Sequence, residues 1–169
     1  MADRRPLIIN PAANQIQEFT DSDALLLSGQ SLKFLSPLIE KVDIDSTALT
    51  GTHTHSLIDD GNLHYATSAS TVNFTYNLRG SASVSVNSMM STGQSLGFSL
   101  FVDSTLSTGI STTTYMAAFQ IDGSTQTVEW QGGAEPNTRL GAGTDNYAFT
   151  IIKTADATFK VFGALSNHA

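Results

Sequence analysis

The strictest pattern in the sequence is an alternation of large apolar and polar side chains between residues 72 and 78. Every second position there is apolar: Val72, Phe74, Tyr76 and Leu78. Successive side chains of a β-strand point to opposite faces of the sheet, so this period of two predicts a strand with one face toward a core. The alternate positions are polar and are expected to face solvent.

Shorter segments of the same kind follow one another from residue 40 to the C-terminus. The stretches expected to form strands are 42–45, 72–78, 82–87, 95–102, 114–121, 127–131, 147–153 and 158–164. Between two of them, Asp122-Gly123 predicts a tight hairpin, because this pair tolerates positive φ. One helical turn at most is expected near residues 87–92, with Ser88 as its cap. The pattern predicts an all-β fold, an antiparallel β-sandwich of jelly-roll type.

The first forty residues differ from the rest of the chain. They contain three of the four prolines, and proline forbids a ladder hydrogen bond and restricts the residue before it. We therefore predict an extended N-terminal arm over residues 1–40 and a β-sandwich domain over residues 41–169. The apolar side chains expected to hold the arm to neighbouring copies or to a particle are Leu7, Ile8, Ile9, Ile16 and Phe19. The alternative is an arm that packs along its own domain.

The surface is predicted to be poor in charge. Charged residues make up only 14% of the chain, while Ser and Thr together number 41. Soluble domains average roughly 25% charged residues, so this surface has little electrostatic protection against association. We therefore expect a homo-oligomer. The net charge of −7 argues against nucleic acid as a partner, because contact with phosphates requires basic residues.

Several classes of chemistry find no support in the sequence. It contains no cysteine for a disulfide or a thiolate metal site, and no Gly-x-Ser-x-Gly motif of a nucleophilic serine. The apolar run at the N-terminus is too short for a signal peptide, and no later run approaches a membrane span. We therefore expect no enzymatic activity, no cofactor and no membrane partner, and synthesis in the cytoplasm.

The pair His53-x-His55 is the one motif with metal-ligand character. In a strand the two imidazoles lie on the same face, about 6–7 Å apart at their Cα atoms, near enough to share an ion. Around a three-fold axis, three such pairs would supply six nitrogens. The favoured interpretation is a pair of solvated histidines, so no bound metal is expected. The nearby acidic residues do not fit the ligand spacing of a calcium loop and are interpreted as solvated: Asp43, Asp45, Asp59 and Asp60.

Trp130 and Gln131 suggest a different kind of site. An exposed indole beside amide groups is typical of a carbohydrate contact, since aromatic rings combine apolar area with a polar edge. The favoured alternative is that Trp130, two positions after Val128, points inward and closes the sandwich core.

Two parts of the sequence carry motifs that a known group of proteins shares. The segment from Arg5 to Phe19 reads Arg-Pro-Leu-Ile-Ile-Asn-Pro-Ala-Ala-Asn-Gln-Ile-Gln-Glu-Phe. It resembles the N-terminal motif of structural proteins in cyanophages and other marine tailed bacteriophages. From Asp59 onwards the chain is similar to the β-rich terminal domain of such proteins. The segments that carry this second likeness are 78–80, 118–123, 130–136 and 147–154.

The resemblance implies a virion structural protein, described as tail-fibre-like or particle-associated, with no catalytic residues to assign. Other virion proteins and copies of the chain itself, in a trimer for example, are the implied partners. Longer members of the group carry repeats between the two motifs, and this chain has no such insert. A short tail fibre, a neck appendage or a capsid decoration subunit therefore fits better than a long fibre shaft. The alternative function is a receptor-recognition module that binds host surface glycan.

Overall fold

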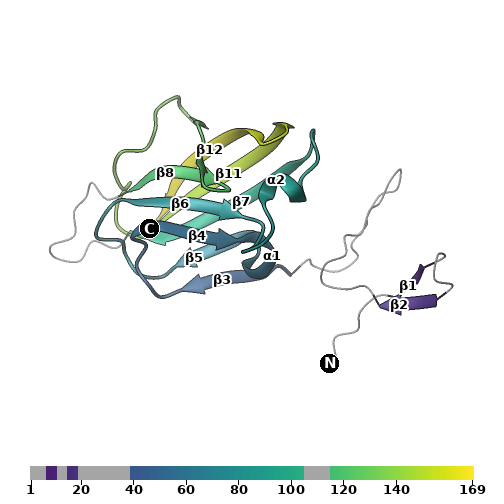
Figure 1. Ribbon diagram of the computed structural model, residues 1–169. Helices are drawn as coiled ribbons and strands as arrows, with labels where there is room; N and C mark the ends of the chain where they lie inside the picture. The colour runs from purple at the N-terminus through teal and green to yellow at the C-terminus, as the bar shows by residue number, and fades with distance from the viewer. Residues whose placement is uncertain (1–6, 11–14, 19–38, 105–114) are drawn as a thin grey trace. The chain divides into compact units, whose positions relative to one another are not determined.

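The computed structural model describes residues 7–10, 15–18, 39–104 and 115–169 (Figure 1). It divides into two units, residues 1–38 and 39–169. In the first unit, strand β1 (Leu7–Asn10) pairs antiparallel with strand β2 (Gln15–Glu18), and Ile9 lies opposite Ile16. The rest of the predicted arm up to residue 38, Phe19 included, lies outside the described residues.

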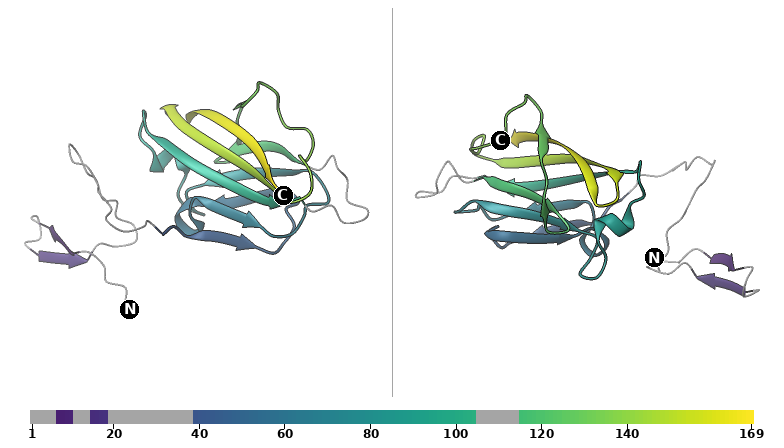
Figure 2. Two further views of the ribbon diagram at one scale, coloured as in Figure 1. Left: turned by 180° about the vertical axis from the view of Figure 1, so that it is seen from behind. Right: turned by 45° about the horizontal axis from the view of Figure 1, so that its top comes forward.

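In the described residues of the second unit, the chain forms two β-sheets and two single-turn helices (Figure 2). The six-stranded sheet has the order β10-β12-β11-β7-β5-β3, and the four-stranded sheet has the order β4-β6-β8-β9. The elements are β3 (Val42–Asp45), β4 (Gly51–Ser56), α1 (Leu57–Asp60), β5 (Leu63–Ala66), β6 (Phe74–Arg79), α2 (Val86–Met89), β7 (Ser95–Asp103), β8 (Met116–Ile121), β9 (Ser124–Thr125), β10 (Val128–Trp130), β11 (Thr144–Ala155) and β12 (Thr158–His168).

From β3 to β8, successive strands alternate between the two sheets. The chain crosses to the facing sheet after each strand and returns in its original direction. As a result β3, β5 and β7 are parallel neighbours in one sheet, and β4, β6 and β8 are parallel neighbours in the other. Antiparallel pairs join β11 to β7 and to β12, and β8 to β9. The prediction of antiparallel sheets is therefore wrong, because both sheets are mixed.

The core lies between the inner faces of the two sheets. Phe119 of β8 stacks on Phe149 of β11 with ring centroids 4.2 Å apart, and Tyr76 of β6 lies 5.5 Å from Phe98 of β7. Full burial of such a side chain contributes roughly 1.5–3 kcal/mol. The buried apolar face predicted for residues 72–78 is confirmed at Phe74, Tyr76 and Leu78, whereas Val72 precedes β6 and is 50% exposed. The expected solvent face is wrong at Asn77, which is only 6% exposed.

Two local predictions around α2 are wrong. Residues 82–87 do not form a strand, since α2 begins at Val86, and the cap of this helix is Ser85 rather than Ser88. The Oγ of Ser85 accepts a hydrogen bond from the backbone N–H of Ser88, and the carboxylate of Asp122 accepts from those of Val86 and Asn87. These acceptors satisfy N–H groups that a helix start leaves unpaired.

The Asp122-Gly123 turn is confirmed, with φ of 52° and 82° at its two residues. It joins β8 to the two-residue strand β9. The strand predicted after this turn, residues 127–131, does not complete the hairpin with β8. Its counterpart β10 instead pairs parallel with β12 of the six-stranded sheet. In the described parts of the chain, no helix is long and apolar enough to cross a membrane.

Candidate metal centre

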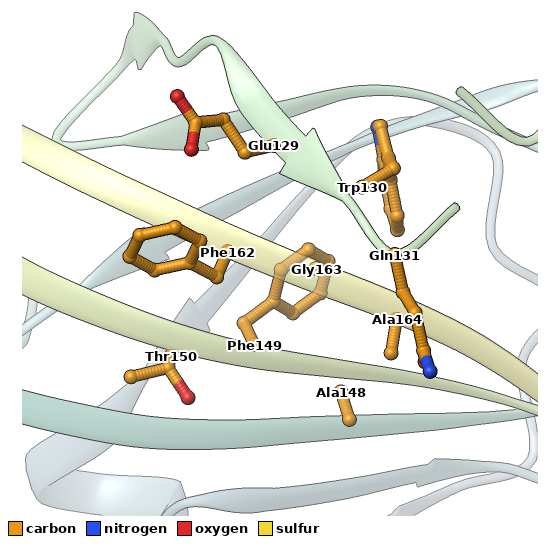
Figure 3. A pocket seen from close by; sticks show the side chains of 9 residues that line it. All are labelled: Glu129, Trp130, Gln131, Ala148, Phe149, Thr150, Phe162, Gly163 and Ala164. Atoms are coloured by element: carbon orange, nitrogen blue, oxygen red, sulfur yellow. The ribbon is translucent and has the colours of Figure 1, made fainter. Parts of the chain in front are cut away.

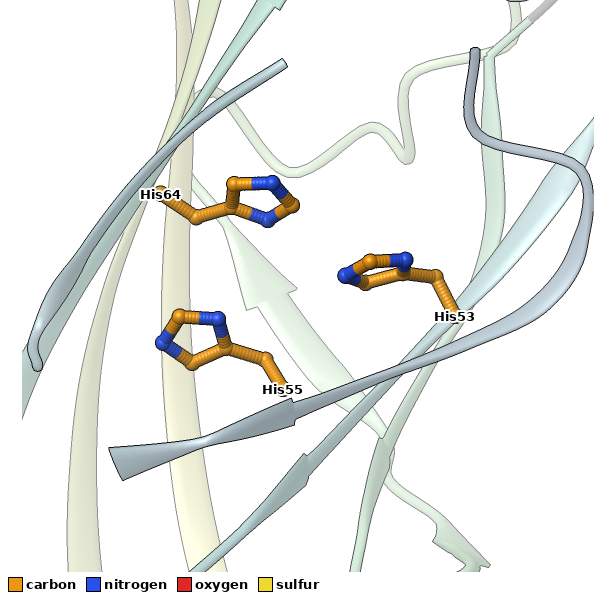
Figure 4. A group of neighbouring side chains, drawn as sticks. All are labelled: His53, His55 and His64. Atoms are coloured by element: carbon orange, nitrogen blue, oxygen red, sulfur yellow. The ribbon is translucent and has the colours of Figure 1, made fainter. Parts of the chain in front are cut away.

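Three of the four histidines converge between the two sheets. His53 and His55 lie on the same face of β4, and His64 comes from β5 of the facing sheet (Figure 4). The ring of His64 lies 4.8 Å from that of His53 and 5.3 Å from that of His55, measured between centroids. One nitrogen of each ring lies within 4.8 Å of a nitrogen of both other rings. We refer to His53, His55 and His64 as the histidine cluster.

A carboxylate from β3 faces the histidine cluster. Asp43 is the register partner of His64 in the parallel pair of β3 and β5, so the two side chains share a face. Its Oδ2 lies 3.7 Å from His55 Nδ1 and 3.8 Å from His64 Nε2. A second carboxylate, that of Asp60 in α1, lies within 4.8 Å of the nearest ligand atoms of Asp43 and His55. The donor set therefore combines imidazole nitrogen with carboxylate oxygen.

The outer nitrogens of the two buried imidazoles have partners of their own. His55 Nε2 lies 2.8 Å from the carbonyl oxygen of Gly61, and because a carbonyl only accepts, this nitrogen carries the proton. The other nitrogen, Nδ1, faces Asp43. On the other side, His64 Nδ1 lies 2.6 Å from the hydroxyl of Tyr76. Contacts of this kind fix the orientation of a metal-binding imidazole.

The glycine that orients His55 is required by its surroundings. Gly61 ends α1 with a φ of 88°, and a Cβ at this position would lie 2.7 Å from the carbonyl oxygen of Lys41. A side chain would therefore clash with the segment that leads into β3, in a backbone conformation that glycine adopts readily. This close approach holds the Gly61 carbonyl where His55 can donate to it.

The two innermost imidazoles are almost fully enclosed. His55 and His64 are 1% and 0% exposed. Burial, assisted by the neighbouring His53 and His55, lowers the pKa of His64 to about 4, and burial also lowers the pKa of His53. His64 and His53 are therefore neutral at pH 7. Neither His55 Nδ1 nor His64 Nε2 has a hydrogen-bond partner, and leaving a buried polar atom unpaired costs about 1–3 kcal/mol.

The structure bears on the sequence hypotheses for this region in different ways. His53 and His55 share a face, as predicted, but His55 is buried, so the alternative of two solvated histidines is wrong for it. Asp43 faces the histidine cluster, and about a third of its side chain stays exposed: 33%. Sequence reasoning missed His64, and the available signal was that three of the four histidines lie within residues 53–64. The idea of a shared ion stays a prediction.

Strand β3 has the reverse of the usual polarity. Asp43 points toward the interior, whereas the apolar side chains on either side of it, Val42 and Ile44, are 40% and 67% exposed. A strand normally buries its apolar face, and departures from such patterns concentrate at functional sites. The inward carboxylate is the feature that makes this end of the two sheets a candidate site.

Trp130 lies at the margin of the core. Its ring approaches Phe149 and Tyr147 edge-on, with centroids 5.8 and 6.4 Å away, while its outer part stays accessible. It lines a hollow of about 480 Å³ together with Glu129, Gln131 and Phe162 (Figure 3). The glycan contact predicted for Trp130 and Gln131 stays a prediction.

Comparison with protein-family models, with curated proteins and with solved structures gave no match to this chain. The likeness to phage structural proteins therefore depends on the sequence motifs given above.

Proposed function

We propose that this chain is a non-enzymatic structural protein of a tailed bacteriophage particle, present on its surface in several copies. The segment from Arg5 to Phe19 and the β-rich second half support this assignment through their resemblance to such proteins. In this proposal the two facing sheets form a β-sandwich body, and residues 1–40 form the arm that attaches it, through Leu7, Ile8, Ile9, Ile16 and Phe19.

The observation that carries the proposal is an apolar hollow on the outer face of the six-stranded sheet. It has a volume of about 390 Å³ and is lined by Val42, Leu63, Tyr65, Phe101, Thr144 and His168. We call it the outer hollow. Exposed apolar patches of this kind mark contacts with other proteins, and a surface with few charges does not oppose association. The outer hollow thus supports a role in which the body packs against neighbouring subunits.

Incorporation into particles tests this proposal. A chain that lacks residues 1–38 should remain folded, because these residues form a unit separate from the body, and it should be lost from purified particles. Tyr65→Lys, which places a charge in the outer hollow, should reduce incorporation of the full chain without unfolding it. Normal incorporation of both variants would contradict the proposal.

A second function, recognition of host surface glycan, is favoured by the partly exposed indole of Trp130 beside Gln131 and Glu129. Sugar rings pack on aromatic faces while amides and carboxylates bond their hydroxyls. Binding of the purified chain to a glycan array, lost in Trp130→Ala, would support this function. An array without signal would contradict glycan recognition, and only the structural role would remain proposed.

A further inference from the structure

We propose that His55, His64 and Asp43 bind one divalent transition-metal ion of the zinc class. His53, one nitrogen of which lies within 4.8 Å of a nitrogen of each of the other two histidines, supplies a fourth ligand. The inference is independent of the proposed function, because it depends only on atoms inside the body.

The distances between the donor atoms suit a tetrahedral ion. Zinc binds imidazole nitrogen and carboxylate oxygen at about 2.0–2.2 Å, which places neighbouring ligand atoms about 3.3–3.5 Å apart. Asp43 Oδ2 lies 3.7 Å from His55 Nδ1 and 3.8 Å from His64 Nε2. These separations are too long for hydrogen bonds and exceed the tetrahedral spacing by only a few tenths of an ångström. These two contacts of Asp43 would therefore reach the tetrahedral spacing with small shifts of the side chains.

The two buried nitrogens that face Asp43 are the independent sign of a ligand. His55 Nδ1 and His64 Nε2 are both enclosed and both without a hydrogen-bond partner, although buried polar atoms in folded proteins nearly always have one. An ion between them would satisfy both. The Gly61 carbonyl already holds the proton of His55 on the far nitrogen, and the Tyr76 hydroxyl can accept the proton of His64 in the same way.

The donor chemistry selects the kind of ion. Imidazole nitrogens with one carboxylate suit zinc and its first-row neighbours, whereas calcium and magnesium prefer sites made of oxygen alone.

Such an ion would join the two sheets at their edges. Asp43 lies on β3, the edge strand of the six-stranded sheet, and His55 lies on β4, the edge strand of the four-stranded sheet. The chain contains no cysteine, so no disulfide can perform this role. An ion that binds the folded chain and not the unfolded chain would raise the free energy of unfolding by mass action.

The test begins with the full chain, purified without a histidine tag and stripped with a chelator. Titration with Co²⁺ should produce the visible absorption of a tetrahedral site, saturating at one ion per chain. Zn²⁺ should abolish this absorption and Ca²⁺ should not. The thermal midpoint should rise with Zn²⁺ and return when the chelator is added. A wild-type chain that binds neither Co²⁺ nor Zn²⁺ stoichiometrically at micromolar concentration would overturn the proposal.

Variants assign the ligands. His55→Gln and His64→Gln should each weaken binding by more than about 100-fold, while Tyr76→Phe, which removes only the contact to His64, should cost about 10- to 100-fold. His168→Gln is the matched control, because the fourth histidine is exposed on β12 and outside the cluster. Equal losses in His168→Gln and His64→Gln would contradict the assignment.

Nitrogen-15 NMR spectra of the imidazole rings in the wild-type chain give a readout that does not depend on whether a variant folds. Zn²⁺ should change the chemical shifts of His55 Nδ1 and His64 Nε2 and leave those of both His168 nitrogens unchanged. Shifts confined to His168 would overturn the proposal.

Discussion

The indole of Trp130 lies against the α-carbon of Gly163, its register partner in the parallel pair of β10 and β12. A Cβ on Gly163 would come within 2.8 Å of Cε3 and Cζ3 of the ring. Only glycine leaves room for the indole to reach Phe149 and close this end of the core. The short strand β10 is thus held in place partly by the absence of a side chain on β12.

Gly163→Ala should therefore displace the indole and lower the free energy of unfolding by about 1–3 kcal/mol, the usual cost of overpacking. Urea denaturation measures the loss, and iodide should quench the fluorescence of the only tryptophan more strongly than in the wild-type chain. Gly97→Ala is the control, because nothing lies within 4 Å of a Cβ there. Equal stabilities of the two variants would contradict the packing described.

Lys153 holds the end of α2 from a strand of the six-stranded sheet. Its Nζ donates to the carbonyl oxygens of Asn87 and Met90, at 2.6 and 2.9 Å, and the residue is only 6% exposed. Lys153→Met keeps the apolar stem and leaves two carbonyls without this donor, so it should cost about 1–3 kcal/mol in urea denaturation. Lys160→Met removes an exposed partner of Glu129 and should cost less than about 1 kcal/mol.

Asp122 has two roles, one in a turn and one at the start of α2. It adopts a φ of 52° in the β8–β9 turn, and its carboxylate accepts from the N–H groups of Val86 and Asn87. Asp122→Ala removes both acceptors and should cost about 1–2 kcal/mol, with faster amide hydrogen exchange at Val86 and Asn87. Asp122→Asn keeps one acceptor and tolerance of positive φ, so its loss should be smaller.

The stability of the body should fall in alkali. Burial raises the pKa of Tyr147 to about 12 from a usual value of 10.0, so the folded chain retains a phenolic proton that the unfolded chain releases. The free energy of unfolding should therefore decrease as the pH rises from about 10 to about 12, by about 2–3 kcal/mol from this group.

Tyr147→Phe tests this assignment. The variant lacks the hydroxyl that accepts from the Met116 N–H, so at pH 7 it should be less stable by about 1 kcal/mol. Its further loss between pH 10 and pH 12 should nevertheless be smaller than that of the wild-type chain. An unchanged dependence on pH, followed by denaturation at several pH values, would show that Tyr147 does not carry the effect.

Sequence reasoning predicted the strands better than their partners. The period of two at residues 74–78 identifies a strand and its buried face, because both are local properties. Which strand lies beside it depends on where the chain crosses between sheets, and nothing local to β6 indicates that β4 and β8 flank it in parallel. The antiparallel prediction failed for this reason.

The candidate site was predicted only in part for a related reason. The spacing of His53 and His55 places both on one face of a strand, which sequence can show. Whether His64 and Asp43 lie beside these two histidines depends on the packing of β3 and β5 opposite β4. In β3 the alternation identified the strand but not its inward face, because Asp43 faces the histidine cluster while Val42 and Ile44 are exposed.

Quantitative mass spectrometry of purified particles tests the structural role most directly. Particles of a phage whose genome encodes the chain should contain it in several copies. Its copy-number ratio to the major capsid protein should stay constant through density-gradient purification. Abundant chain in the infected cells, with none in the particles, would contradict the account.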